Sequence, residues 1–214
     1  ASHIENAALQ STDEATHLTG NSLNNILTAG KTLYAHLYNS NGANQLAGGL
    51  GDDTYKRVSN NDVVIEQANA GIDTVYFSGN YLNLWDNVEN VVLEVLDEVY
   101  FTSAFLQQVN GNALDNRITA NNVKGSNIDG GDGNDTLIGL NGADTLQGGN
   151  GNDTLLGGAG DDSLEGNGGY NVIDGGAGTN RISMGFYING GGVHEVYGGQ
   201  GTNIITMYGT SQAI

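Results

Sequence analysis

The sequence predicts an all-β repeat fold, in which short similar units stack against their neighbours. The first observation is a nine-residue pattern, G-G-x-G-x-D-x-U-x with U a large aliphatic residue, which occurs four times in register within residues 130–165. The second is the composition, because the 214 residues include 35 glycines and no proline, and the glycines are periodic. The third is a set of short β-branched and aromatic runs within residues 57–110. Periodic glycine indicates a repeat architecture, whereas scattered glycine with few apolar residues would indicate disorder.

Each position of the nonapeptide has a physical task. Glycine permits a backbone with positive φ or a close approach between chain segments. The aliphatic position places one side chain per repeat into a shared interior, and its residues are Leu137, Leu146, Leu155 and Leu164. The second copy departs from the pattern only at Leu140, which replaces the second glycine. These spacings predict a stack whose interior is one aliphatic ladder.

The sixth position of each repeat carries an aspartate. These residues are Asp135, Asp144, Asp153 and Asp162, and residues 130–165 hold seven acidic residues and no lysine or arginine. A column of carboxylates is unfavourable unless a cation lies between them, and oxygen-only ligands suit Ca²⁺, which takes six to eight oxygens. We therefore predict that these turns bind several Ca²⁺ ions. The alternative is that the aspartates are solvated turn residues that keep the chain soluble.

The four repeats resemble the RTX (repeats-in-toxin, haemolysin-type calcium-binding) nonapeptide. The resemblance implies a right-handed parallel β-roll, or β-solenoid, in which each repeat forms a Ca²⁺-binding turn followed by a short strand. It also implies that each ion lies between the turns of repeats i and i+2, so that Asp135 pairs with Asp153 and Asp144 with Asp162. The same turns would complete the ligand shells, chiefly through carbonyl oxygens, and the residues concerned are Gly130, Asp132, Gly139, Asn141, Gly148, Asn150, Gly157, Ala159 and Asp161.

Composition excludes several classes of partner. The chain has 24 acidic and 6 basic residues and a formal charge of −18, which makes binding to nucleic acid or to anionic membranes unfavourable. It has no cysteine, so disulfides and cysteine-type zinc sites are excluded. No apolar run approaches the length of a membrane span, and the N-terminus has no basic-plus-hydrophobic signal. The RTX family is typically exported by a C-terminal signal, so we expect a protein that is secreted or held at the bacterial cell surface.

The repeat continues past residue 165 in a decayed form. The aliphatic position persists as Ile173, Ile182, Val196 and Ile205, with residues 184–188 interrupting the period. The sixth position changes to Asn171, Asn180, His194 and Asn203. We therefore expect the roll to extend to about residue 206 but to lose strong ion binding after the level of Asp153 and Asp162.

Weaker repeats precede the central block. Residues 39–56 read as two further nonapeptides, the second of which is a full match with Asp53 in the sixth position and therefore a candidate Ca²⁺ ligand. Residues 20–28 also resemble residues 111–119. This larger internal similarity leads us to expect that the chain is part of a longer tandem-repeat protein.

Residues 57–110 have a different pattern. Short β-branched and aromatic runs predict strands within residues 62–66, 72–78, 90–96 and 99–101. A helical turn is predicted over residues 102–109. The segment resembles the linker-plus-strand units that alternate with RTX nonapeptides in large secreted bacterial proteins. We thus predict three parts: a partial linker unit with degenerate nonapeptides (1–56), a strand-rich linker unit (57–110) and the main roll (111–214).

The predicted function is a non-catalytic Ca²⁺-binding β-roll module of a type I exported bacterial protein, which folds on Ca²⁺ binding outside the cell. No histidine pair has zinc-site spacing, no serine lies in a nucleophile-elbow motif, and no nucleotide fingerprint occurs. We therefore expect no enzyme activity from this chain. Two alternatives remain open. One is an adhesin module that binds a glycan or cell-surface ligand, and the other is an accessory module of a secreted enzyme such as an alginate epimerase, protease or lipase.

Overall fold

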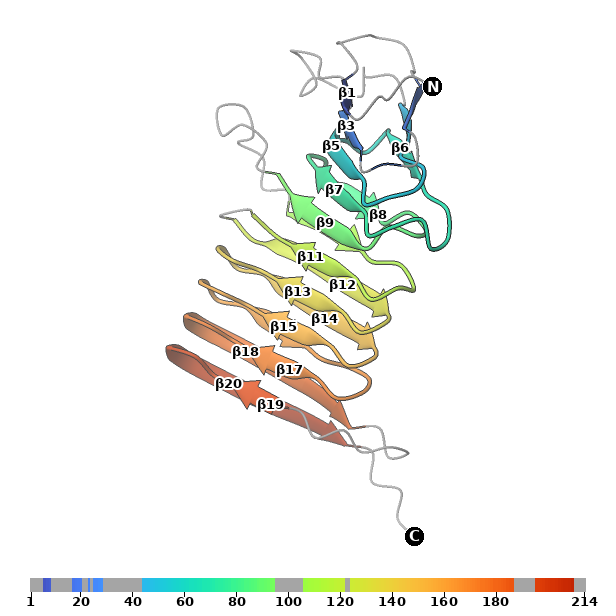
Figure 1. Cartoon of the computed structure of the whole chain (residues 1–214). Coiled ribbons are helices and arrows are strands. Elements are labelled where there is room, and N and C mark those ends of the chain that lie inside the picture. The colour runs from blue at the N-terminus through green and yellow to red at the C-terminus, as the bar shows by residue number, and fades with distance from the viewer. Residues whose placement is uncertain are drawn as a thin grey trace. The chain divides into compact units, whose positions relative to one another are not determined.

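A computed structural model of the chain describes residues 6–8, 17–20, 23, 25–28, 44–94, 106–121, 124–186 and 195–209 (Figure 1). The chain divides into two compact units, Ala1–Phe105 and Leu106–Ile214. All regular elements of the described residues are β-strands. Within these residues, no helix has the length and apolar character needed to cross a membrane. The all-β prediction is therefore confirmed.

The unit Leu106–Ile214 is a stack of parallel strands (Figure 1). Its strands are β10 (Gln107–Asn110), β11 (Arg117–Thr119), β12 (Ser126–Asp132), β13 (Thr136–Ile138), β14 (Thr145–Asn150), β15 (Thr154–Leu156), β16 (Ser163–Glu165), β17 (Val172–Asp174), β18 (Gly178–Phe186), β19 (Glu195–Tyr197) and β20 (Gly201–Gly209). Odd-numbered strands from β11 to β19 form one sheet, and even-numbered strands from β10 to β20 form another. The chain therefore alternates between the two sheets, as the predicted parallel β-solenoid requires.

Strand register shows that two nonapeptides make one coil of this solenoid. Leu137 of β13 pairs with Leu155 of β15, and Leu146 of β14 pairs with Leu164 of β16. Each short strand buries only its central residue and leaves its two neighbours half-exposed. Because equivalent residues pair, the period of the sequence becomes a column of equivalent positions in space.

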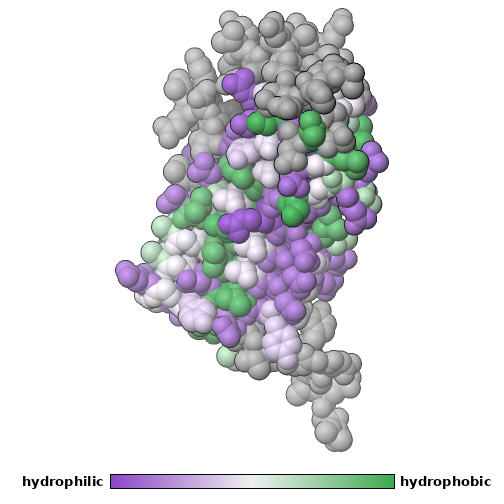
Figure 2. All heavy atoms as spheres, viewed as in Figure 1, coloured by the Kyte–Doolittle hydropathy of each residue, from purple (hydrophilic) through white to green (hydrophobic). Residues whose placement is uncertain are grey.

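The interior is the aliphatic ladder that the sequence predicts. Its fully buried members are Ile128, Leu137, Leu146, Leu155, Leu164, Ile173 and Ile182. On the face drawn in Figure 2, hydrophilic residues predominate and apolar residues lie between them. One large aliphatic side chain in nine residues is a thin core, because the burial of such a side chain contributes only about 1.5–3 kcal/mol.

Glycine at the fourth position of the nonapeptide lets successive coils approach closely. Gly151 has a φ of 138°, and a Cβ added to it would lie 1.8 Å from the carbonyl oxygen of Gly133 in the preceding coil. Any side chain at this position would therefore push the coils apart. Leu140, the departure from the pattern, takes a left-handed φ of 64° and is exposed.

The roll extends to β20, which confirms the predicted end near residue 206. Strands β18 and β20 pair in register from Gly178 and Gly201 to Phe186 and Gly209. Residues 184–186 continue β18 instead of interrupting it, whereas residues 187–194, including His194, lie outside the described part of the chain. Ile205 is 48% exposed because β20 is the last strand of its sheet among the described residues.

The unit Ala1–Phe105 also consists of parallel strands. These are β1 (Asn6–Ala8), β2 (His17–Thr19), β3 (Ile26–Thr28), β4 (Gln45–Ala47), β5 (Thr54–Val58), β6 (Val63–Ile65), β7 (Thr74–Phe77), β8 (Tyr81–Asn83) and β9 (Asn90–Leu93). Strands β1, β3, β5, β7 and β9 follow one another in one sheet, while β2, β4 and β6 form a second. Its interior is more aromatic than that of the roll, with Tyr55 and Phe77 fully buried.

The strand predictions in this region meet different outcomes. Strands β6, β7 and β9 lie within three of the predicted runs, while residues 99–101 lie outside the described residues. The predicted helical turn is wrong over its last residues, because Gln107–Asn110 forms β10 and pairs with β12. Residues 107 and 109 are buried and residue 108 is exposed, which is the period of a strand. The proposed divisions after residues 56 and 110 stay predictions.

Candidate metal centre

The four sixth-position aspartates form two buried columns. Asp135, Asp144, Asp153 and Asp162 are only 1–2% exposed. Since repeats i and i+2 stack in register, Asp135 is adjacent to Asp153 on the next coil, and Asp144 is adjacent to Asp162. The structure therefore brings together the pairs that the family resemblance implies, and it buries all four side chains.

One carboxylate oxygen of each aspartate connects two coils. The backbone N–H of Asp135 donates to Oδ1 of Asp153 at 2.9 Å, and that of Asp144 donates to Oδ1 of Asp162 at 2.8 Å. The preceding coil repeats the arrangement, with Asn116 donating to Asp135 at 2.8 Å and Ser126 donating to Asp144 at 2.6 Å. These bonds fix each carboxylate through its Oδ1 atom. They do so regardless of which atoms lie beside Oδ2.

The second oxygen of each aspartate, Oδ2, is buried and has no hydrogen-bond partner among the described residues. An unpartnered buried carboxylate oxygen is costly unless a cation or a proton satisfies it. Burial raises the pKa of Asp135 and of Asp144 to about 7 and that of Asp153 to about 6. Burial also raises the pKa of Asp162. The protein alone thus holds these charges poorly near neutral pH, and a cation between the coils would remove that cost.

Main-chain oxygens converge on the same space as the unpartnered carboxylate oxygens. A Cβ added to Gly130 would lie 2.3 Å from Oδ2 of Asp135 and 2.5 Å from the carbonyl oxygen of Gly148 on the next coil. A Cβ on Gly139 would lie 2.6 Å from Oδ2 of Asp144 and 2.3 Å from the carbonyl oxygen of Gly157. The first-position glycine therefore leaves a small space that faces oxygens from two consecutive coils. Oxygen-only donors of this kind fit Ca²⁺.

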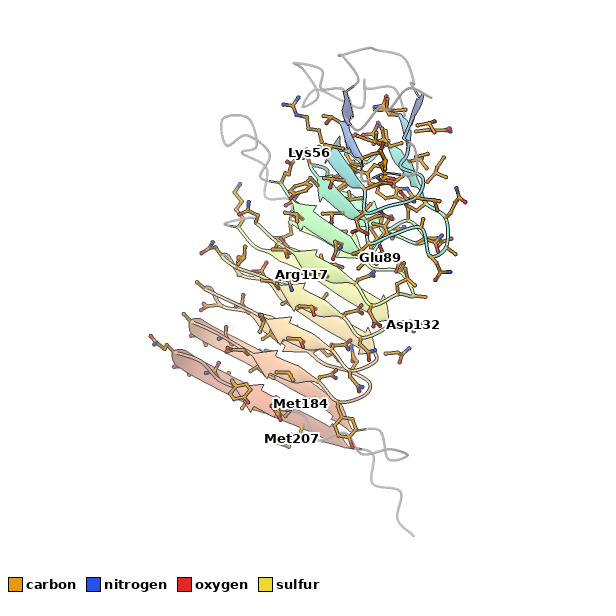
Figure 3. All side chains as sticks on the ribbon, viewed as in Figure 1. Lys56, Glu89, Arg117, Asp132, Met184 and Met207 are labelled. Carbon is orange, nitrogen blue, oxygen red and sulfur yellow. The ribbon has the colours of Figure 1, made fainter. Side chains whose placement is uncertain are left out.

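The other predicted residues of the turns lie at the surface. Asp132 is exposed at the turn edge of the roll (Figure 3), and its Oδ1 accepts a hydrogen bond of 2.8 Å from Nδ2 of Asn150. Asp161 is exposed and its Oδ1 accepts the backbone N–H of Thr179 at 2.7 Å. Asn141 and Ala159 pair with each other through the main chain. The side chains of Asp132 and Asp161 are thus outside the buried columns, where only main-chain oxygens of these turns could contribute.

Asparagine closes both columns on the C-terminal side. Asn171 Oδ1 accepts the backbone N–H of Asp153 at 2.7 Å, as an aspartate would. Its Nδ2 donates to the carbonyl oxygens of Gly166 at 2.8 Å and Gly168 at 2.9 Å within its own turn. In the other column, Asn180 Oδ1 accepts the backbone N–H of Asp162 at 2.9 Å. The neutral Asn171 amide therefore gives the turn carbonyls a hydrogen-bond donor where an aspartate could not.

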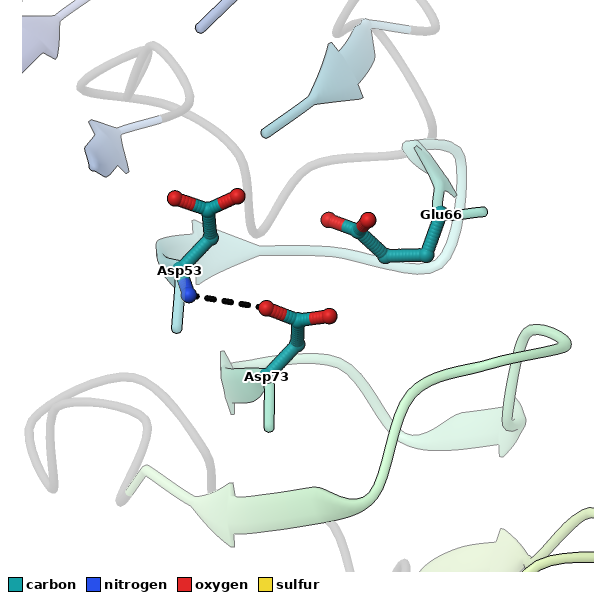
Figure 4. Close-up of side chains that lie close together, drawn as sticks. All are labelled: Asp53, Glu66 and Asp73. Atoms are coloured by element: carbon teal, nitrogen blue, oxygen red, sulfur yellow. Dashed lines mark hydrogen bonds between the residues drawn. The ribbon is translucent and has the colours of Figure 1, made fainter. Parts of the chain in front are cut away.

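Asp53 lies in a different setting from the four central aspartates. Its Oδ1 accepts the backbone N–H of Asn25 at 2.6 Å, and its own backbone N–H donates to Oδ1 of Asp73 at 2.8 Å (Figure 4). Asp73 therefore follows Asp53 on the next coil, as Asp153 follows Asp135, and Glu66 lies beside Asp53 and Asp73. Sequence reasoning missed Glu66 and Asp73 because they fall outside the nine-residue period. The run Gly71–Val75 (GIDTV) nevertheless repeats positions four to eight of the nonapeptide, and that signal identifies Asp73.

Comparison with known proteins agrees with the geometry of the columns. The family model of the RTX calcium-binding nonapeptide repeat matches residues 38–55, 129–164 and 156–185. These matches include Asp53, all four central aspartates and the asparagine turns at residues 171 and 180. No curated protein matches the chain.

Proposed function

We propose that this chain, which contains RTX calcium-binding nonapeptide repeats folded as a parallel β-solenoid, is a non-catalytic Ca²⁺-binding module of a secreted bacterial protein. The observation that carries the proposal is the set of unpartnered Oδ2 atoms on Asp135, Asp144, Asp153 and Asp162. Each lies in a position where a carbonyl oxygen of the next coil is also close. A cation bound between the coils would satisfy these buried carboxylates and offset the repulsion between them.

Two levels of the roll have the most complete donor sets. One lies between the turns of Asp135 and Asp153, and the other between the turns of Asp144 and Asp162. The main-chain oxygens of these turns would add further ligands, from Gly130, Asp132, Gly139, Asn141, Gly148, Asn150, Gly157, Ala159 and Asp161. A bound Ca²⁺ would supply the positive charge that the buried carboxylates lack. Dissociation constants of about 10⁻⁴ to 10⁻³ M are typical of extracellular calcium modules.

Ion binding would then be linked to folding. The interior has one large aliphatic residue per repeat, and the acidic columns repel themselves when no cation is present. A ligand that binds only the folded chain stabilises it by mass action, so the free energy of Ca²⁺ binding becomes free energy of folding. RTX repeats are typical of secreted bacterial proteins. A chain that stays unfolded at low cytosolic Ca²⁺ and folds outside the cell would suit type I export.

Calorimetric titration of the chelator-treated chain with Ca²⁺ tests the proposal. Asp153→Asn keeps an oxygen for the backbone N–H of Asp135 but removes the charge, so we expect it to lower the number of bound ions by about one. Glu165→Gln is the matched control, because it removes one charge from the outward-facing end of β16. Equal Ca²⁺ binding by the two variants would show that the columns are not ion sites.

A further inference from the structure

A second acidic cluster lies in the unit Ala1–Phe105 and extends beyond the nonapeptides. It consists of Asp53, directly before β5, Glu66, directly after β6, and Asp73, directly before β7. One carboxylate oxygen from each residue lies within 4.8 Å of the others. Figure 4 shows the Glu66 side chain extending toward the two aspartates. The fold thus brings three acids from three separate segments to one place.

Each carboxylate in the cluster has one occupied and one unpartnered oxygen. Oδ1 of Asp53 accepts the Asn25 backbone N–H, Oδ1 of Asp73 accepts the Asp53 backbone N–H, and Oε1 of Glu66 accepts the Tyr55 hydroxyl. The other three oxygens, Asp53 Oδ2, Glu66 Oε2 and Asp73 Oδ2, are buried with no partner among the described residues. Asp53 and Asp73 are each only 1% exposed. Three unpartnered oxygens on three adjacent acids point to a missing positive partner.

Asp62 shows how the same unit treats a buried acid that needs no ion. It is 4% exposed, and its Oδ1 accepts hydrogen bonds from the backbone N–H and Nδ2 of Asn44. Its Oδ2 accepts from the backbone N–H and Oγ of Ser59, both at 2.8 Å. Both oxygens of Asp62 are therefore satisfied by the protein. The unpartnered oxygens of the cluster are not a general feature of buried acids in this unit.

The basic residues next to the cluster do not enter it. Lys56 and Arg57 of β5 are exposed, and the Lys56 ammonium lies 5.8 Å from the centroid of the Tyr76 ring. The Tyr55 hydroxyl accepts the backbone N–H of Gly48 at 2.7 Å and donates to Glu66, which holds that carboxylate in place. The cluster therefore has a fixed geometry, and neither Lys56 nor Arg57 compensates its charge.

We propose that Asp53, Glu66 and Asp73 form a further Ca²⁺ site, in which two acids from outside the nonapeptides join the nonapeptide residue Asp53. Ca²⁺ binds oxygens at about 2.3–2.6 Å, so two ligands on opposite sides of one ion are separated by up to about 5 Å. One ion can thus contact all three carboxylates at their observed spacing. Asp53 lies within a matched RTX repeat, but Glu66 and Asp73 lie outside the matches, so the repeat does not assign these two ligands. All three proposed ligands belong to the unit Ala1–Phe105.

Isosteric variants of the full chain provide the first test. Asp73→Asn and Glu66→Gln keep the oxygens that accept hydrogen bonds from Asp53 and Tyr55 but remove one charge each. In a calorimetric Ca²⁺ titration, each should lose about one bound ion or weaken one site by roughly tenfold or more. Asp86→Asn is the control, because Asp86 is an exposed acid of the same unit. Wild-type stoichiometry and affinity in both cluster variants would overturn the proposal.

The wild-type chain provides a second test that does not depend on the folding of any variant. Crystals grown with Tb³⁺, which replaces Ca²⁺ at oxygen sites, should show an anomalous peak between the three carboxylates. Absence of a peak there, with peaks elsewhere in the same crystal, would overturn the site. Loss of an ion in Asp73→Asn but not in Asp153→Asn would refute the proposed function of the columns and leave this site standing. Loss of an ion in Asp153→Asn but not in Asp73→Asn would refute this site and leave the proposed function of the columns standing.

Discussion

The two oxygens of the Asp153 carboxylate have different neighbours. Oδ1 accepts the backbone N–H of Asp135 and joins two coils, while Oδ2 has no partner among the described residues. The first contact would exist with asparagine as well, as Asn171 shows one coil further on. What only aspartate provides is the negative charge on Oδ2. The sixth-position side chains from Asp135 to Asn180 thus each link two coils through the main chain, and we propose that only the acidic ones also bind an ion.

The first-position glycine allows a direct test of where the ion lies. A methyl group at Gly130 would occupy the space between Oδ2 of Asp135 and the carbonyl oxygen of Gly148. Gly130→Ala should therefore lower the Ca²⁺ stoichiometry by about one ion, although it removes no charged ligand. Calorimetric titration measures this loss.

Gly168→Ala is the matched control for that substitution. A Cβ on Gly168 would meet its nearest neighbour, the carbonyl oxygen of Gly149, at 3.3 Å, which a small shift can accommodate. We expect this variant to bind as many ions as the wild-type chain. If Gly130→Ala also binds the full number, the ion does not lie beside the first-position glycine.

At the scale of one coil, the change from aspartate to asparagine alters how the turn is closed. The Asn171 amide donates to the carbonyl oxygens of Gly166 and Gly168, so these oxygens already have a hydrogen-bond donor. The turn of Asn171 therefore needs no ion to satisfy these two carbonyl oxygens. The asparagine coils therefore continue the solenoid past Asp153 and Asp162 without adding to its negative charge.

Asn171→Asp should convert one such coil into an ion-dependent one. The carboxylate can still accept the Asp153 backbone N–H but can no longer donate to Gly166 and Gly168. We expect about one additional Ca²⁺ per chain, together with a lower melting temperature in chelator, because the turn then lacks its amide donor. Titration calorimetry and thermal melting monitored by circular dichroism measure the two effects.

Asn152→Asp controls for the added charge in the preceding coil. Asn152 is exposed, and its Oδ1 accepts the Tyr170 backbone N–H, a contact that aspartate can also make. This variant should bind no additional ion. An unchanged stoichiometry in Asn171→Asp would mean that the amide does not take the place of a cation.

The strands of the roll could be predicted because each nonapeptide repeats its own environment. Equivalent residues such as Leu137 and Leu155 must pair once the repeat stacks, so period alone sets the register. The complete acidic cluster could not be found in this way, although the run Gly71–Val75 indicates Asp73. Asp53 and Asp73 are separated by 20 residues, and Glu66 reaches them from a separate segment, so their meeting depends on the path of a non-repeating chain. The predicted helical turn over residues 102–109 is wrong at residues 107–109, because the four-residue strand β10 is too short to show its alternation clearly.

On the scale of the whole molecule, negative charge and a thin interior both lower the stability of the folded chain. The chain has a formal charge of −18, and its buried aspartates lie in columns without a basic residue between them. Both features disfavour a compact chain without cations. Divalent cations between the coils would reverse the balance, since each would neutralise buried charge and connect two turns at once. We therefore expect folding itself to depend on Ca²⁺.

Far-ultraviolet circular dichroism of the full chain in chelator, followed by Ca²⁺ addition, tests this dependence most directly. The predicted result is loss of the β-strand signal over much of the chain in chelator and its recovery with Ca²⁺. Mg²⁺ at the same concentration should restore less of the β-strand signal than Ca²⁺, because Mg²⁺ demands near-ideal octahedral geometry and loses its bound water reluctantly. A strand spectrum that is the same in chelator and in Ca²⁺ would contradict the account.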